Sequence, residues 1–253
     1  MNSLARNIDL HALDGLRSLF LERMPDFGDF SDRVGKYWNH ERAYKEQIID
    51  FVHAQLPPSV FEGSHVENAP SIVQATLRTL TGRVKEAGHD SPATQNIVGW
   101  RYFEFLRELT PEEKPRFAAA MGDLLYGDGC EPERVGRFTE QVWELYRPDP
   151  NNKPYALSRI FPTFFLMFLR PRSNIAVRTD MFVTASKQLL GHSVLEYEPL
   201  SGSAYEAILT FSEAVFRQLE SWAWCPRDMI DVHSFLWIVT RPSSEYTTTH
   251  EPT

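Results

Sequence analysis

The sequence predicts a mainly α fold, a two-lobed helical domain with a cleft. Apolar residues recur at helical spacing along most of the 253 residues, which is the main signal of amphipathic helices. Helix start and stop signals bound several of these stretches. No set of segments alternates apolar and polar residues as half-buried strands do, and no internal repeat is present. The expected organisation is an N-terminal helical lobe over 1–90, a second helical lobe over 91–242 and a flexible tail over 243–253.

Four amphipathic segments in the N-terminal part are expected to be helices: 9–24, 41–56, 71–88 and 95–109. In the first of them, Leu13, Leu16 and Phe20 fall on one face. Pro57 stops the second segment because proline cannot continue a helix. Gly88 ends the third, as glycine commonly does at a helix C-terminus.

Five further helices are expected in the C-terminal part: 110–125, 131–146, 180–191, 203–221 and 226–239. The first opens with a capping box, in which Thr110 is the cap, Pro111 the first helical residue and Glu113 the reciprocal partner. Pro115 should bend this helix near its start. An apolar run over 159–169 is expected to be buried core.

Composition and charge indicate a soluble protein of the cytoplasm. The two cysteines, Cys130 and Cys225, do not make a disulfide framework and suggest a reducing compartment. The N-terminal residues carry Asp9 and Asp14 and have no long apolar stretch, so no signal peptide is expected. The longest apolar run, 160–169, is too short to span a membrane and contains a proline.

Positive charge is concentrated in one stretch, residues 147–187, which we call the basic segment. It holds seven Lys or Arg and two Asp, a net charge of +5 in a chain whose total is −8, which leaves −13 for the remainder. A basic segment on an acidic protein is typical of a localised phosphate contact. The alternative is that these arginines form ion pairs with acidic helices or cap helix ends.

Several side chains in this segment can donate to phosphate oxygens, and a helix that begins near residue 179 would add its N-terminal dipole. The candidate DNA-binding residues are Arg159, Arg170, Arg172, Ser173, Asn174, Arg178, Thr179 and Lys187.

Residues 175–191 resemble the segment after the hairpin in helix-hairpin-helix DNA glycosylases. The shared features are an apolar lead-in, a threonine, a second apolar stretch and a closing Leu-Leu-Gly (Ile175 to Val177, Thr179, Met181 to Val183 and Leu189 to Gly191). The sequence departs from the family at two positions. Arg178 stands where the family has its catalytic aspartate, and Asp180 stands where the family has a histidine. It also lacks the glycine-rich hairpin. The resemblance implies a fold distantly like these glycosylases.

Residues 96–240 resemble, more broadly, a helical domain of McrB-type modification-dependent restriction proteins. The shared features are a helix that bears a tryptophan, the stretch around residues 158–182 and the closing helix around 226–239. Both resemblances imply double-stranded DNA with modified bases as the partner, and defence against foreign, phage DNA as the role.

A glycosylase needs a carboxylate near the sugar, aromatic walls around a flipped base and cations for the flanking phosphates. Asp180, amid three arginines, is the favoured catalyst. Asp231 is a second candidate, three residues after Asp228 and therefore on the same helix face. The alternative for Thr179 or Asp180 is a helix N-cap, and the alternative for Asp228 is a first-turn acid that responds to the helix dipole.

A stacking wall for the base could come from the aromatic residues Trp100, Tyr102 and Phe103. Aromatics at helical spacing are, however, more often core. His233 lies between apolar residues, which favours a satisfied core histidine over a catalytic one.

The leading hypothesis is a DNA glycosylase that needs no cofactor and excises a flipped, modified base. The eight histidines are scattered without metal-ligand spacing, and no phosphate-binding loop or dinucleotide fingerprint is present. The first alternative is a non-catalytic reader of modified DNA that recruits separate effectors. The second is an acidic helical interaction protein in which the arginines are structural.

Overall fold

The computed structural model describes residues 8–82, 97–99, 103–146, 154–196 and 198–242. These ranges are mainly helical and contain no strand, so the expected mainly α class is confirmed. The α-helices are α1 (Leu10–Arg23), α2 (Gly35–Tyr37), α3 (Ala43–Gln55), α4 (His65–Thr81), α5 (Phe105–Glu108), α6 (Glu113–Tyr126), α7 (Glu131–Val142), α8 (Pro154–Leu169), α9 (Thr179–Leu190), α10 (Gly202–Ser221) and α11 (Met229–Thr240).

Three short turns of other helix types connect them. A π turn, η2 (Trp38–Arg42), joins α2 to α3, and the amide of Ala43 donates back to the Trp38 carbonyl. Two 3₁₀ turns, η3 (Pro58–Phe61) and η6 (Trp143–Tyr146), follow α3 and α7. Single π turns inside α-helices are rare, and those that occur are often at functional sites. The presence of η2 therefore makes the α2–α3 region a candidate for a functional site.

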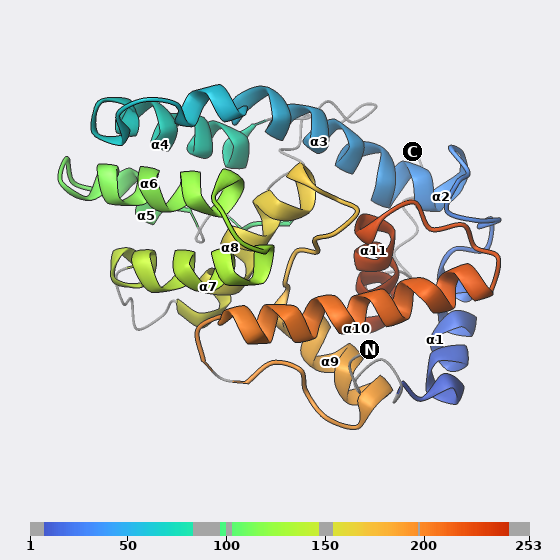
Figure 1. Cartoon of the computed structure of the whole chain (residues 1–253). Helices are drawn as coiled ribbons and strands as arrows, with labels where there is room; N and C mark the ends of the chain where they lie inside the picture. Colours follow the sequence, from blue (N-terminus) through green and yellow to red (C-terminus); the bar gives the residue numbers. More distant parts are fainter. Residues whose placement is uncertain (1–7, 83–96, 100–102, 147–153, 197, 243–253) are drawn as a thin grey trace.

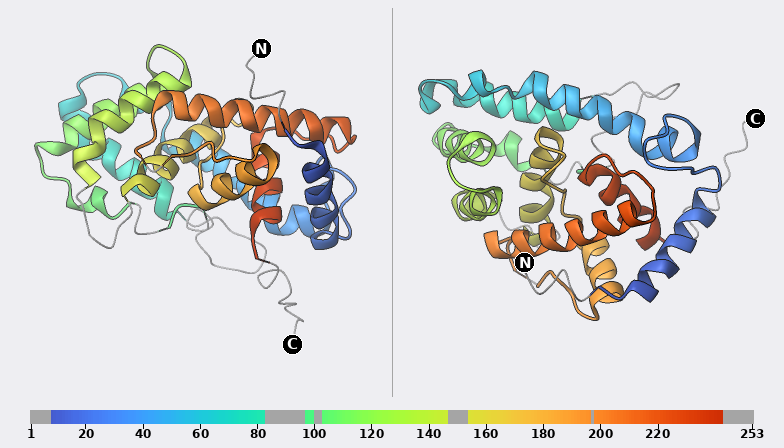
Figure 2. Two further views of the ribbon diagram at one scale, coloured as in Figure 1. Left: turned by 90° about the horizontal axis from the view of Figure 1, so that it is seen from below. Right: turned by 45° about the vertical axis from the view of Figure 1, so that its right-hand side comes forward.

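The helices pack in an order that brings the first and last helices, α1 and α11, into contact. Helices α4, α6, α7 and α10 each contact the next, and α8 passes behind them against α3 (Figure 1). Helix α11 contacts α1, α9, α10 and η2, so the last helix is enclosed by early and late elements (Figure 2). This arrangement places η2 and α3 beside α11, although about 190 residues separate them in the chain.

The buried apolar residues form one core cluster that extends from Leu13 to Val239. Helix α8 supplies four fully buried phenylalanines, Phe161, Phe164, Phe165 and Phe168. Their burial accounts for the predominance of apolar residues over 160–169. Residues of both expected lobes contribute to this cluster. The division into lobes stays a prediction.

Several helix boundaries differ from expectation. Helix α4 begins at His65, where the Ser64 hydroxyl accepts from the Glu67 amide, six residues earlier than predicted. Of the helix expected over 95–109, residues 95–96 and 100–102 lie outside the described ranges, and the described part forms only the short helix α5. Part of the helix expected to end at Gly88 also lies outside them.

The capping box at residue 110 is present. The Glu113 carboxylate accepts from the Thr110 amide at 2.8 Å, and the Glu113 amide donates to the Thr110 hydroxyl at 3.3 Å. The helix itself begins at Glu113 rather than at Pro111. Across the described ranges, no helix has the length and apolar character that crossing a membrane requires.

Candidate functional site

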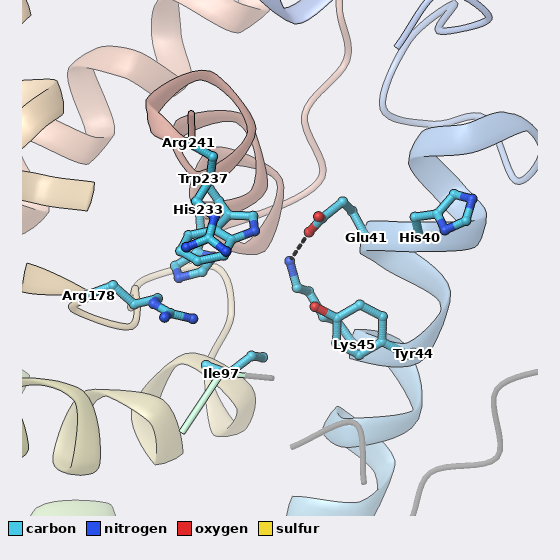
Figure 3. A pocket seen from close by; sticks show the side chains of 9 residues that line it. All are labelled: His40, Glu41, Tyr44, Lys45, Ile97, Arg178, His233, Trp237 and Arg241. Carbon is cyan, nitrogen blue, oxygen red and sulfur yellow. Dashed lines mark hydrogen bonds and ion pairs between the residues drawn. The ribbon is translucent and has the colours of Figure 1, made fainter. Parts of the chain in front are cut away.

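A pocket of about 250 Å³ lies between the η2–α3 segment and α11 (Figure 3). Its lining side chains come from two facing walls and from residues near the floor: His40, Glu41, Tyr44, Lys45, Ile97, Arg178, His233, Trp237 and Arg241. The volume lies just under the range typical of drug-sized ligands, so the pocket suits a small ligand.

One wall is a single face of α11. His233, Trp237 and Arg241 are four residues apart, and residues at this spacing lie one above the other on a helix. The guanidinium groups of Arg241 and Arg178 lie over the Trp237 ring, at 4.0 Å and 4.1 Å from its centroid. Arg178 reaches this wall from the N-cap position of α9. Two cations and an aromatic surface therefore meet at one point.

The opposite wall carries a buried lysine. Lys45 is 1% exposed, and its Nζ donates to Glu41 Oε2 at 3.0 Å and to the Ser234 hydroxyl at 2.8 Å. Glu41 and Lys45 are four residues apart, so the π turn and α3 present them on the same side. Burial lowers the pKa of Lys45, while the charge and hydrogen bond of Glu41 act in the opposite direction.

His233 is the buried polar group of this pocket that lacks a partner. It is 2% exposed, and neither ring nitrogen has a hydrogen-bond partner among the described residues. Burial, followed by the charges of Lys45 and Arg178, holds the pKa of His233 well below its ordinary value, so the ring is neutral. The expectation of a buried histidine is confirmed. The expectation that it is satisfied by the protein is wrong.

A second group of charged residues lies beside the pocket and joins the same elements. We call it the ion cluster, and its members are Tyr37, Arg42, Glu46, Arg227, Asp228 and Asp231. Arg42 binds Asp228 with both terminal nitrogens, at 2.6 Å and 2.8 Å. Such fork-to-fork pairs combine strength with a fixed geometry. Asp228 is also the N-cap of α11 and accepts from the Ile230 amide, whereas the first-turn acid of this helix is Asp231. Asp228 therefore lies one position before the first turn in which it was expected.

Asp231 is the centre of the ion cluster. It is fully buried, and its Oδ1 accepts from the Tyr37 hydroxyl at 2.6 Å and from Arg42 at 3.1 Å. Its Oδ2 accepts from the Arg227 backbone amide at 2.8 Å. Burial and the Asp231 charge raise the pKa of Tyr37 well above its ordinary value. Asp231 does not line the pocket, and its role as a catalyst stays a prediction.

Asp180 lies in the first turn of α9 and is exposed. The N-cap position is occupied by Arg178, whose side chain makes no capping hydrogen bond, so the alternative that Thr179 or Asp180 caps this helix is wrong. Asp180 is not among the residues that line the pocket. Its assignment as the catalyst stays a prediction.

Two candidate DNA-binding residues, Arg159 and Asn174, are buried. Arg159 is 3% exposed and donates to the Thr179 hydroxyl and to the backbone carbonyls of Glu196 and Glu198. Asn174 is fully buried and its side-chain carbonyl accepts from the Tyr205 hydroxyl. These contacts hold the loop before α9 and the segment before α10 against α8 and α10.

The remaining candidates point in different directions. Arg170 donates to the Leu125 carbonyl and lies 4.0 Å from Glu131, so it packs toward α6 and α7 rather than toward the pocket. Three other candidates, Arg172, Ser173 and Lys187, are exposed. The described charges of the basic segment, from Arg159 to Lys187, therefore do not gather at one point. Arg178 is the candidate that the structure brings to the pocket.

The expected stacking wall is placed only in part. Phe103 is 1% exposed and belongs to the hydrophobic core, which matches the alternative interpretation of these aromatics. Trp100 and Tyr102 lie outside the described residues. The aromatic side chains of the pocket are instead Tyr44 and Trp237.

Sequence reasoning did not select most residues of the pocket. Glu41 and Lys45 carry a usable signal, because both fall on the face of their helix that also bears Ile48 and Val52, where charges are not expected. The spacing of His233, Trp237 and Arg241 is a second signal. Within the described part of the chain, no group of His, Cys, Asp and Glu could hold a metal ion.

Comparisons with known proteins identify no relative of this chain. No protein-family model, curated protein or solved structure matches this chain.

Proposed function

We propose that this chain binds DNA and holds a single nucleotide in the pocket between the η2–α3 segment and α11. The observation that carries the proposal is the meeting of Arg178, Trp237 and Arg241 at one wall. A site for an extruded nucleotide needs an aromatic surface for the base and cations for its phosphates. The proposed partner is modified phage DNA, as the sequence suggests. The proposed site is a cleft between two lobes, as in the glycosylases, and the proposed location is the cytoplasm.

Recognition of the nucleotide is favoured over its cleavage. The carboxylate that lines the pocket, Glu41, is already hydrogen-bonded to Lys45, and Asp180 is exposed outside the lining residues. We therefore propose a reader of modified DNA, similar in role to the specificity domains of modification-dependent restriction systems. A glycosylase is the second candidate, because Glu41 places one acidic group inside the pocket.

Fluorescence anisotropy with duplexes that differ only in one modified cytosine tests the reader. We expect tighter binding to the modified duplex and a linear fall of log affinity with log salt. Arg178→Gln should reduce that salt slope by about 1, the value for one lost phosphate contact. Arg217→Gln, on the exposed side of α10, is the matched control. Binding that is absent, or that ignores salt, contradicts the proposal.

An abasic-site assay on the same duplexes tests the glycosylase. The reader predicts that the modified base stays attached to its sugar. Release of the base by the wild type would establish the second candidate. Loss of that release in Asp180→Asn or in Glu41→Gln would then identify the carboxylate.

A further inference from the structure

The amino group of Lys45 is buried at the wall of a cavity. Lysine side chains are almost never fully buried unless they are paired, and Lys45 is 1% exposed and lines the pocket (Figure 3). Its Nζ donates to Glu41 at 3.0 Å and to the Ser234 hydroxyl at 2.8 Å. Because an ammonium group has three N–H bonds, one of them has no partner among the described residues.

The surroundings of Lys45 favour release of its proton. Burial has the largest influence on the pKa of Lys45 and lowers it, the charge and hydrogen bond of Glu41 offset this only in part, and the charge of Arg42 lowers it further. The neutral amine is the nucleophilic form of lysine. Lysines that react with carbonyl compounds are activated by burial or by a neighbouring cation, and Lys45 has both.

We propose that Lys45 forms an imine with a small, uncharged aldehyde that binds in the pocket. The cavity of about 250 Å³ next to Lys45 has room for such a ligand. Amines add to aldehydes reversibly, and the reaction needs only a group that accepts and returns protons. The inference goes beyond the proposed function and does not rest on it, because neither DNA nor the stacked arginines of the pocket take part.

The hydrogen-bonded pair of Lys45 and Glu41 supplies the protons that the reaction moves. One proton passes from the ammonium to the carboxylate, across 3.0 Å, and leaves a free amine beside a carboxylic acid. The amine lone pair forms a bond to the aldehyde carbon, the C=O π electrons move to oxygen, and this oxygen takes a proton from the nitrogen. Glu41 then protonates the resulting hydroxyl, which leaves as water while the C=N bond forms.

The product has the same charges as the starting pair. The protonated imine carries one positive charge, as the ammonium does, and it lies beside the Glu41 carboxylate that the reaction regenerates. An uncharged aldehyde therefore enters, and water leaves, without adding a buried charge. Because an uncompensated buried charge is costly, the Lys45–Glu41 pair suits an uncharged aldehyde better than one that carries an acidic group.

His233 is an independent sign of a ligand in this pocket. It lies across the pocket from Lys45 (Figure 3), and both of its nitrogens lack a hydrogen-bond partner in the described part of the chain. Buried polar groups in native proteins are nearly always satisfied, by protein, water or ligand. A neutral imidazole has one N–H donor. In the proposed reaction it donates to the aldehyde oxygen and polarises the carbonyl group.

Reductive trapping in the full chain tests the proposal. The protein is incubated with benzaldehyde and sodium cyanoborohydride at neutral pH, and peptide mass spectrometry follows the labelling of each lysine. We expect Lys45 to be labelled at least about tenfold faster than the exposed Lys187 on α9, because lowering an amine pKa by one unit raises its neutral fraction about tenfold. Equal or slower labelling of Lys45 overturns the proposal. In urea the two rates should become equal, and a difference that persists there also contradicts it.

Two variants test the groups around Lys45. Glu41→Gln should slow the labelling of Lys45 about a hundredfold, as loss of a general acid–base group does. His233→Leu should slow it about tenfold, and His53→Leu, at an exposed position of α3, should not change it. Circular dichroism shows whether each variant is folded, and the labelling of Lys187 is the internal control. If Glu41→Gln does not fold, His233→Leu decides, and an unchanged rate in a folded variant contradicts the proposal.

The outcome is separable from that of the proposed function. Salt-sensitive binding of modified duplexes without preferential trapping at Lys45 would support the proposed function and refute this inference. Preferential trapping at Lys45 in a chain that binds no duplex would do the opposite.

Discussion

The η2–α3 segment and α11 meet in two neighbouring places, and both places bury charged side chains. In the ion cluster every charged group has an ion-pair partner. Asp231 accepts from Tyr37 and Arg42 through one oxygen and from Arg227 through the other. In the pocket, Glu41 is paired with Lys45, and Arg178 and Arg241 lie over the Trp237 ring. His233, on the same helix as Asp231, has no partner among the described residues.

The difference teaches where function is to be sought in a protein of this kind. A fully paired buried cluster fixes geometry, and its members have few hydrogen-bonding positions left for a ligand. A buried polar group without a partner beside a cavity, as His233 is among the described residues, retains capacity to bind. Asp231, which the sequence suggested as a catalyst, belongs to the ion cluster. His233, which the sequence suggested as a core residue, lines the pocket.

The largest expected effect comes from breaking the ion cluster. Asp231→Asn removes one partner of a buried ion pair and leaves Arg42 partly uncompensated, which should lower the free energy of unfolding by about 3–5 kcal/mol. Urea denaturation measures it. The matched control is Asp180→Asn, an exposed first-turn aspartate that should cost no more than about 1 kcal/mol. Equal losses in the two variants would show that the cluster is not a structural unit.

An intermediate effect is expected from the unpartnered histidine. The pKa of His233 is lowered in the folded state, so below pH ~6.5 the unfolded chain binds a proton that the folded chain does not. Stability from this group is therefore present above pH ~6.5 and is lost as the pH falls, by about 1.4 kcal/mol per pH unit until the folded pKa is reached.

His233→Leu should remove this part of the pH dependence, as measured by urea denaturation at a series of pH values. The exposed His53 on α3 provides the control, since His53→Leu should leave the slope as it is in the wild type. A slope that persists in His233→Leu would mean that other groups titrate in this range.

The smallest expected effect concerns the stacked arginines of the pocket. Arg241→Gln removes one cation from the Trp237 ring and should lower the free energy of unfolding by about 0.5–1 kcal/mol. Arg217→Gln breaks an exposed pair with Glu213, whose side chains are 62% and 56% exposed, and should cost less than that. A loss of several kcal/mol in Arg241→Gln would place Arg241 with the structural cluster rather than with the pocket.

Local features of the fold could be predicted from the sequence because local chemistry determines them. Thr110 and Glu113 bind each other as the capping box requires, and the apolar run of α8 is buried. The sequence does not indicate the start of α4, because its first turn is mostly polar and Pro70, a residue that usually breaks helices, follows it. The packing of η2 against α11 could not be predicted, since it joins residues about 190 positions apart.

The candidate site could be predicted only at Arg178. Net charge over residues 147–187 indicated cations but not their directions, and the structure turns Arg159 inward and Arg170 toward α6 and α7. A helical pattern shows which face a residue occupies, but not whether a neighbouring helix supplies its partner. That is why the pairing of Asp231 and the lack of pairing at His233 became visible only in three dimensions.

The π turn η2 gives this region a particular tolerance of chain length. A π turn absorbs one extra residue within a helix, so the helix on either side keeps nearly the orientation that it has in an uninterrupted α-helix. Tyr37 on one side and Lys45 on the other both reach α11 from this nearly continuous helix. Deleting a single exposed residue there, such as Asn39, would turn η2 into an ordinary α-turn and leave both contacts with α11 within reach.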